Sequence, residues 1–327
     1  MSDTDRRTFV AGVAALSAAS ATSVAAQEAQ SVPPATTPGA AAFPRPPFPL
    51  QRQPWPGLAS KMNPKPDHGE QSYKGSGKLL GKKALITGGD SGIGRAAAIA
   101  YAREGADIAI NYLPAEEPDA REVIALIRAE GRKAVGIPGD LREERFCRRL
   151  VEQATAQLRG LDILVNNAAR QQTRPTIADI SSQDFDDTMK TNVYAPFWLT
   201  KAALERMGPG AVIVNTSSEQ AGDPSKDIVD YAMTRAALLN FTKGMAKQLA
   251  SRGIRVNAVA PGPFWTPLQV SGGATPEKQR TFGETAPLGR PGQPAEIAAL
   301  YVAAADPALS FSTGQIFGAS GGNGQPA

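Results

Sequence analysis

The chain has 327 residues, 42% of them hydrophobic and 20% charged, and a formal net charge of +4 at pH 7. This length provides material for one large core plus non-core N-terminal segments. A single cysteine, Cys147, excludes an internal disulfide, and a single histidine, His68, argues against metal sites and His-based catalytic triads. Basic residues are spread along the chain and have acidic neighbours in places, as at residues 141–145, which predicts solvated helix faces and no nucleic-acid partner.

Residues 1–26 are typical of an export signal. Arg6 and Arg7 precede a weakly apolar, alanine-rich run over residues 9–26, and residues 24–26 offer small side chains to a peptidase. The pattern resembles a twin-arginine signal peptide of a bacterial secretory protein. The run is short and weakly apolar for a membrane span, so we expect a periplasmic protein, exported folded and without stable membrane insertion after cleavage. An uncleaved anchor or a cytoplasmic location is the alternative.

Residues 27–77 are expected to form a Pro/Ala-rich linker and N-terminal extension. The stretch 43–49 reads FPRPPFP, and proline removes backbone donors and favours extended chain. Phe48 and Trp55 leave open the alternative that this segment docks on the domain or on a partner. A plain linker is the favoured interpretation.

Residues 78–327 alternate short apolar runs with longer amphipathic stretches, which predicts parallel strands connected by helices. Because parallel strands are buried on both sides, helices must cover both faces of one sheet. The sequence therefore predicts a single α/β domain with a doubly wound parallel sheet. The expected strands are residues 83–87, 107–111, 134–138, 162–166, 211–215 and 255–259.

The first expected strand runs directly into a glycine-rich loop, TGGDSGIG, at residues 87–94. Glycines there let the backbone turn sharply and approach a pyrophosphate. The helix that follows would direct its N-terminal N–H groups and positive dipole end at that anion. The loop predicts dinucleotide binding at this strand end.

This loop resembles the Thr-Gly-x-x-x-Gly-x-Gly fingerprint of the short-chain dehydrogenase/reductase superfamily. Further motifs agree in order and spacing: residues 166–169 (NNAA), Asn192, Ser218, Tyr231 and residues 261–266 (PGPFWT). The resemblance covers about residues 78–322 and implies a Rossmann-like fold and a homotetramer or homodimer. Residues 66–70, 88–92 and 111–114 also look like a bacterial subgroup of NADP-dependent aldehyde reductases and general stress proteins.

The resemblance implies hydride transfer at nicotinamide C4, coupled to proton transfer by Tyr231. Ser218 would hydrogen-bond the substrate oxygen, and Asn192 would belong to a proton relay. A phenol has an ordinary pKa of about 10, so it needs a nearby positive charge to act near neutral pH. Relatives place Lys four residues after the Tyr, one helical turn on, whereas this chain has Arg235.

Arg235 supplies a charge, but its guanidinium is planar and effectively never deprotonated. Two interpretations follow from this substitution. One is an active NAD(P)-dependent oxidoreductase that converts a small aldehyde, ketone or alcohol. The other is a catalytically weakened nucleotide-binding sensor or interaction protein.

By the same resemblance, the cofactor would lie against Gly88, Ser91, Gly92, Ile93, Gly94, Asn111, Tyr112, Asp140, Leu141, Asn167, Ala168, Tyr231, Arg235, Pro261, Gly262 and Thr266. Asn111 and Tyr112 place no carboxylate after the second strand, which favours NADP over NAD. Asp90 adds negative charge nearby and keeps NAD open as the alternative. Arg95 is a candidate phosphate partner, or simply a helix-surface arginine.

Residues 265–288 are expected to form a lid over the substrate pocket. Trp265 and Leu268 suggest an apolar wall, and residues 171–172 and 219–220 suggest polar edges. Structural packing explains these residues equally well. The sequence does not identify the substrate.

Overall fold

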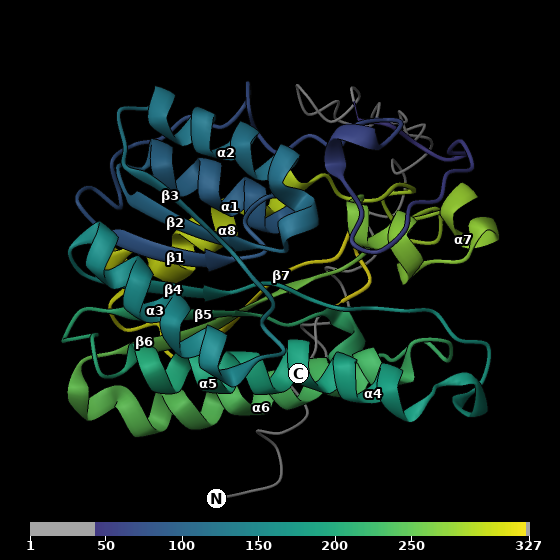
Figure 1. The fold of residues 1–327 in the computed structure, drawn as a ribbon. Coiled ribbons are helices and arrows are strands. Elements are labelled where there is room, and N and C mark those ends of the chain that lie inside the picture. The colour runs from purple at the N-terminus through teal and green to yellow at the C-terminus, as the bar shows by residue number, and fades with distance from the viewer. Residues whose placement is uncertain (1–42, 325–327) are drawn as a thin grey trace, which may run out of the picture. The chain divides into compact units, whose positions relative to one another are not determined.

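The computed structural model describes residues 43–324 (Figure 1). The expected signal at residues 1–26 and the first part of the expected linker, residues 27–42, lie outside the described residues. Within the described range, none of the helices is both long enough and apolar enough to cross a membrane.

A parallel sheet of seven strands forms the centre of the domain, in the order β3-β2-β1-β4-β5-β6-β7. From β1 the chain adds β2 and β3 on one side of the sheet, and the connection after β3 then crosses back to place β4 on the other side of β1. This reversal of strand order is typical of doubly wound sheets. The six strands expected from apolar runs are all present, and the predicted fold class is confirmed. The strands are β1 Lys83–Thr87, β2 Asp107–Tyr112, β3 Ala134–Pro138, β4 Ile163–Asn166, β5 Val212–Thr216, β6 Arg255–Pro261 and β7 Ile316–Ala319.

The seventh strand was not expected from the sequence. β7 pairs with β6 through Ala258 and Ile316, and its residues are only half-buried. An edge strand packs fewer apolar side chains than a central one, so its sequence contains a weaker apolar run.

Side chains alternate between the two faces of the sheet and so build two separate cores. On β1, Ile86 points into one core and Leu85 into the other. The first core is covered by α1, α2 and α8, and the second by α3, α5 and α6, as Figure 1 shows. The helices are α1 Gly92–Arg103, α2 Glu117–Ala129, α3 Glu144–Leu158, α4 Ser182–Met189, α5 Ala195–Ala203, α6 Val229–Leu249, α7 Pro276–Arg280 and α8 Pro294–Ala305.

A π-helical turn, Lys190–Tyr194, joins α4 to α5, and a second, Gln269–Gly273, lies in the expected lid. Short 3₁₀ turns complete the helical structure. They lie at Ala59–Lys61, Pro114–Glu116, Ile177–Asp179, Glu219–Ala221, Ala250–Arg252 and Pro307–Leu309.

The N-terminal extension differs from the plain linker that the sequence favoured, because residues 44–77 pack on the domain. Phe48 is 4% exposed and stacks on the fully buried Trp265, with ring centroids 4.3 Å apart. Backbone bonds hold the extension to the lid segment, including Gln53 N–H to the Val270 carbonyl at 2.9 Å. Prolines disfavour an α-helix, and the 3₁₀ turn Ala59–Lys61 is the one regular element among residues 44–77. The Phe48 ring packs on an apolar partner in the lid.

The end of this extension is attached to α1 rather than to the lid. The Arg103 guanidinium donates to the carbonyls of Gly69, Glu70 and Tyr73, each at 2.7 Å. Next to it, the Glu104 carboxylate accepts from the Tyr73 hydroxyl at 2.8 Å. Two side chains at the end of one helix thus fix the path of the chain into the first strand.

Candidate functional site

A cavity of about 470 Å³ lies beyond the carboxyl ends of the strands. Its wall is built from the loops after β1 to β6 and from the lid segment. It contains every residue predicted to bind cofactor except Gly94, and three of the four predicted catalytic residues. The predicted residues on the wall are Gly88, Ser91, Gly92, Ile93, Asn111, Tyr112, Asp140, Leu141, Asn167, Ala168, Ser218, Tyr231, Arg235, Pro261, Gly262 and Thr266.

The glycine-rich loop depends on its glycines for two physical reasons. Gly88 and Gly92 have φ of +61° and +52°, in the left-handed region that side chains rarely adopt. At Gly94, a Cβ atom would lie 2.0 Å from the Gly88 carbonyl oxygen, so the first turn of α1 packs directly against the loop. Gly94 therefore shapes the loop from behind the cavity wall.

Tyr231 and Arg235 lie one turn apart on α6, and both reach the cavity. The Arg235 guanidinium carbon sits 4.7 Å from the centroid of the Tyr231 ring, over its face. Arg235 Nη1 donates to the carbonyl of Thr216, the last residue of β5, at 2.6 Å. Its Nε is buried without a hydrogen-bond partner among the described residues. The guanidinium is thus fixed between the tyrosine ring and the end of β5.

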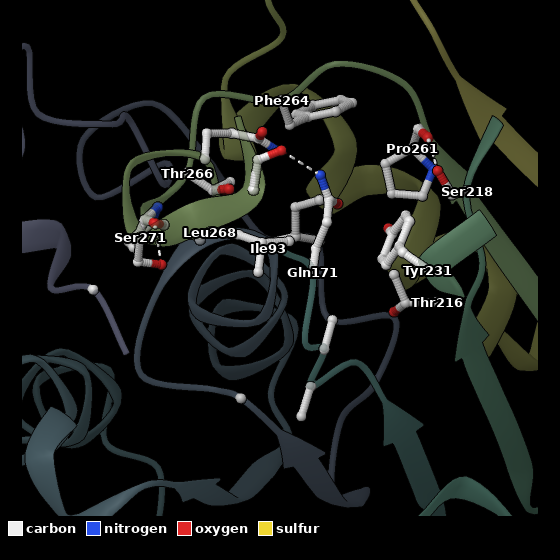
Figure 2. A pocket seen from close by; sticks show the side chains of 18 of the residues that line it. Ile93, Gln171, Thr216, Ser218, Tyr231, Pro261, Phe264, Thr266, Leu268 and Ser271 are labelled. Atoms are coloured by element: carbon white, nitrogen blue, oxygen red, sulfur yellow. Dashed lines mark hydrogen bonds between the residues drawn. The ribbon is translucent and has the colours of Figure 1, made fainter. Parts of the chain in front are cut away.

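Ser218 lies next to Pro261 on the cavity wall, at the end of the cavity that also contains Tyr231 (Figure 2). Its hydroxyl donates to the Pro261 carbonyl at a long 3.4 Å and accepts from Gln220 N–H at 3.2 Å. A long hydrogen bond is weak, so this hydroxyl can be redirected toward a bound oxygen atom at little cost. Ser218 and Tyr231 therefore present two hydroxyl groups at the same end of the cavity.

Asn192 is not part of the cavity wall. It is fully buried in the π-helical turn, where its amide accepts from Arg170 N–H at 2.8 Å and donates to the Arg170 carbonyl at 2.9 Å. It also donates to the Thr234 hydroxyl at 3.1 Å. Asn192, the residue expected in the proton relay, therefore connects the loop after β4 to α6 through these hydrogen bonds. The π-turn that places it carries no recognisable sequence signal.

The expected lid, residues 265–288, does contribute to the cavity wall, but not through its tryptophan. Leu268 lines the cavity. Trp265 is not one of the described residues that line it, and its ring stacks on Phe48 instead. Its indole N–H donates to the Pro64 carbonyl at 2.9 Å. Gln171 also lines the cavity, and its amide donates to the Gly273 carbonyl of the lid at 2.7 Å (Figure 2).

Arg95, a candidate phosphate partner from the sequence, does not reach the cavity. Its guanidinium is bonded to Glu70 at 3.0 Å and Glu122 at 3.1 Å. Of the described residues on the wall, only Arg235 and Lys278 are cationic. Lys278 forms an ion pair with Asp227.

The end of the cavity that adjoins β1 and β2 is acidic. Asp90 and Glu116 line it, together with Asn111 and Tyr112. Burial raises the pKa of both carboxyl groups above their usual range, and the charge of Asp90 raises the pKa of Glu116 further. Sequence reasoning noticed the charge of Asp90 but missed Glu116, because only the fold brings the 3₁₀ turn Pro114–Glu116 beside the glycine-rich loop.

The N-terminal extension contributes to the same wall. Trp55, Pro56 and Gly57 line the cavity, where a Cβ atom on Gly57 would lie 3.1 Å from the Pro267 carbonyl oxygen. These residues carried no sequence signal for a site, apart from an aromatic side chain in a proline-rich stretch.

Comparisons with known proteins found a matching family model, sequence relatives and similar solved structures. A protein-family model described as enoyl-(acyl carrier protein) reductase matches residues 88–323. The chain is 54% identical over 275 residues to the uncharacterized oxidoreductase YghA of Escherichia coli (strain K12), covering 84% of this chain and 94% of the relative. General stress protein 39 of Bacillus subtilis (strain 168) is 49% identical, with coverages of 82% and 92%. A crystal structure of a short chain dehydrogenase from Burkholderia cenocepacia J2315 in complex with NADP superposes with a TM-score of 0.69 at 35% identity, covering 75% of this chain and 98% of that chain.

Proposed function

The chain belongs to the short-chain dehydrogenase/reductase superfamily, and on this basis we propose that it is an NAD(P)-dependent oxidoreductase. We propose a small aldehyde or ketone as substrate, with oxidation of the corresponding alcohol as the reverse reaction. The observation that carries the proposal is that Tyr231, Ser218 and the glycine-rich loop line one cavity. NADP is the first cofactor to test, because the crystallised neighbour binds it.

The residues present fit a dinucleotide. The loop at residues 87–94 leaves no side chain between its backbone and the cavity at Gly88 and Gly92, and α1 begins at Gly92 with its N–H groups directed toward that loop. Asn167 is held in place because its side-chain amide donates to the Thr87 carbonyl at 3.0 Å. When bound, a nicotinamide dinucleotide supplies or accepts the hydride.

In the proposed reduction, Tyr231 donates a proton to the substrate oxygen as the carbonyl carbon receives the hydride, which gives the alcohol. Ser218 turns its hydroxyl from the Pro261 carbonyl to the same oxygen and polarises it. Arg235 contributes positive charge over the tyrosine ring. Leu268 and Gln220 border the substrate end, which combines an apolar and a polar wall.

Single-turnover oxidation of NADPH with a panel of aldehydes and ketones tests this proposal. Replacement of Tyr231 by Phe should slow turnover by about 10²- to 10⁴-fold, because the proton donor is lost while the ring remains. Tyr194→Phe is the matched control, because Tyr194 is exposed and does not line the cavity. This variant should leave the rate unchanged. An unchanged rate in Tyr231→Phe would contradict the proposed role.

A weakened, nucleotide-binding protein is the second candidate, and one observation favours it. Arg235 Nη1 donates a hydrogen bond to the Thr216 carbonyl at 2.6 Å, so this Nη1–H donor is not free to bind a cofactor. This candidate is supported over the first if wild type binds NADPH saturably but turns over none of the aldehydes and ketones tested, and if Arg235→Lys restores turnover.

Location and assembly are also proposals. The twin-arginine pattern at Arg6 and Arg7 supports export of the folded protein to the periplasm. A homotetramer or homodimer is the assembly expected from the family resemblance. Light scattering of the purified mature protein would distinguish these assemblies from a monomer.

A further inference from the structure

Residues 51–63 of the N-terminal extension form a loop, which we call the strap, and the tip of this loop borders the cavity. The tip consists of Trp55, Pro56 and Gly57, which all line the cavity wall. The strap precedes residues 88–323, which match the family model, so that model assigns it no role. Its place on the wall is therefore a feature that the motifs of the dinucleotide site do not explain.

Two glutamine side chains hold the strap closed. The Gln53 amide accepts from Leu58 N–H at 2.8 Å and donates to the Leu58 carbonyl at 3.0 Å. The Gln51 amide bonds the backbone N–H and carbonyl of Asn63 in the same way. Each glutamine closes one turn of the loop with both ends of its amide, and Trp55 lies inside the inner turn. The position of the tip is therefore fixed before a ligand binds, which reduces the ordering cost of binding.

The strap is attached to the lid at one side and to α2 at the other. On the lid side, Gln53 N–H donates to the Val270 carbonyl at 2.9 Å. On the α2 side, the fully buried Asp119 carboxylate accepts from Ala59 N–H at 2.6 Å and from Ser60 N–H at 3.3 Å. The tip lies between these two attachments in the chain, so both sides of the site hold it on the cavity wall.

The tip is also close to the glycine-rich loop. A Cβ atom on Gly57 would lie 3.1 Å from the Pro267 carbonyl oxygen, and a Cβ atom on Gly92 would lie 3.2 Å from the Thr266 side chain. Thr266 and Pro267 therefore separate the tip from the loop that receives the diphosphate in folds of this kind. All four residues line the cavity. The strap tip and the expected diphosphate site are neighbours on one wall.

Trp55 has no hydrogen-bonding or aromatic partner among the described residues, although it is half-buried. Trp265, by contrast, is fully buried, stacks on Phe48 and donates its indole N–H to the Pro64 carbonyl at 2.9 Å. Trp265 thus packs the lid, whereas Trp55 presents an unpaired aromatic side chain at the cavity. An aromatic side chain in such a position can stack on the flat rings of a nucleotide.

We propose that Trp55 packs against the dinucleotide bound at the glycine-rich loop, and that the strap thereby slows release of the cofactor. The Gln51 and Gln53 pairs hold the tryptophan at the cavity. The attachments to the lid and to Asp119 keep the loop in place while the cofactor is bound. The inference rests on the proposed dinucleotide-binding function and adds to it a contact residue from the N-terminal extension.

Stopped-flow fluorescence of NADPH release tests this role in the purified full chain. The complex with NADPH is mixed with excess NADP, and the loss of bound NADPH is followed. Trp55→Ala should speed release by roughly tenfold or more, because stacking of an aromatic side chain on a base contributes about that much to binding. It should change the association rate constant by less than about threefold, since loss of a contact acts mainly on dissociation. Trp55→Phe, which keeps a ring, should release NADPH at close to the wild-type rate.

Gln53→Ala opens the inner turn without removing the tryptophan, so it should also speed release. Gln183→Ala is its matched control, because the Gln183 amide also forms a hydrogen bond, to Asp187 at 2.9 Å, but Gln183 does not line the cavity. Leu50→Ala is the control for truncation of Trp55, because Leu50 belongs to the same extension, is 60% exposed and does not line the cavity. Both controls should release NADPH at the wild-type rate.

Amide hydrogen exchange gives a second readout, which a purely structural role of the strap would leave unchanged. Addition of NADPH should slow exchange at the Leu58 and Ala59 amides of the wild-type protein, because a bound cofactor opposes local opening of the strap. In Trp55→Ala this added protection should be lost.

Three results would each overturn this inference: wild-type release rates in both Trp55→Ala and Gln53→Ala, release from Trp55→Phe as fast as from Trp55→Ala, or exchange at Leu58 and Ala59 that NADPH does not slow. The proposed function would stand in these cases, because NADPH still binds. Failure of the wild-type protein to bind NADPH would overturn the inference and the proposed function together.

Discussion

Arg235 lies over the face of the Tyr231 ring, with its guanidinium carbon 4.7 Å from the ring centroid. The same guanidinium donates to the Thr216 carbonyl at 2.6 Å and is only 2% exposed. An arginine in the place of the family's lysine therefore links α6 to the end of β5, beside the proposed proton donor. Its role in folding and its role in turnover can be separated by experiment.

The substitution Arg235→Lys should raise turnover and lower stability. An ammonium on a flexible chain can rotate its three donors toward a cofactor hydroxyl, which a planar, clamped guanidinium cannot do. The variant loses a charged hydrogen bond to Thr216, which should cost about 1.5–3 kcal/mol of unfolding free energy. Single-turnover NADPH oxidation and urea unfolding measure the two effects. A variant slower than wild type would show that the guanidinium is the better partner for this site.

Truncation of Phe48 should release the N-terminal extension from the lid. Phe48→Ala removes the ring that stacks on Trp265 and should weaken docking by about 3 kcal/mol. Amide hydrogen exchange at Gln53, whose N–H bonds the Val270 carbonyl, reports this release directly. Leu50→Ala, on a side chain that is 60% exposed, is the control and should change stability by less than about 0.5 kcal/mol. Unchanged Gln53 protection in Phe48→Ala would show that backbone bonds alone hold the extension.

Acidification should destabilise the segment around His68 and Glu70. Burial lowers the pKa of His68, despite the nearby Glu70 carboxylate 2.9 Å from its Nδ1. Burial alone would raise the pKa of Glu70, but the hydrogen bond and charge of His68, with a contribution from Arg95, lower it to about 2.

Both shifts make the folded state bind fewer protons than the unfolded chain, so stability falls as the pH decreases below about 6.5. Urea unfolding between about pH 8 and about pH 5 should show a steeper loss for wild type than for His68→Gln. Lys74→Gln, on an exposed side chain, should retain the wild-type slope. Parallel curves for wild type and His68→Gln would exclude this histidine as the source.

Export should depend on the paired arginines near the N-terminus. The double substitution Arg6→Lys with Arg7→Lys keeps the charge but removes the twin-arginine pattern, so the protein should accumulate in the cytoplasm. Cell fractionation followed by immunoblotting measures the distribution. Arg52→Lys, on an exposed residue well beyond the signal, is the control and should be exported normally. Periplasmic accumulation of the double variant would contradict twin-arginine export.

The sequence by itself determined the parallel sheet and most of the cavity wall. Buried parallel strands need continuous apolar runs, such as residues 83–87 and 211–215, and these are visible without a structure. The turn after β1 needs positive φ at Gly88 and Gly92, so its glycines also mark its position. Strand ends in such a sheet converge, which is why motifs far apart in the chain met as expected.

Only the tertiary structure decided which side chains face the cavity and which carry charge there. Trp265 packs on Phe48 of the N-terminal extension, Arg95 forms an ion pair with Glu70, and Asn192 lies in a π-helical turn. Glu116 became part of the cavity wall, beside Asp90. Each outcome depends on partners distant in sequence, and no local pattern encodes a contact whose energy comes from another part of the chain.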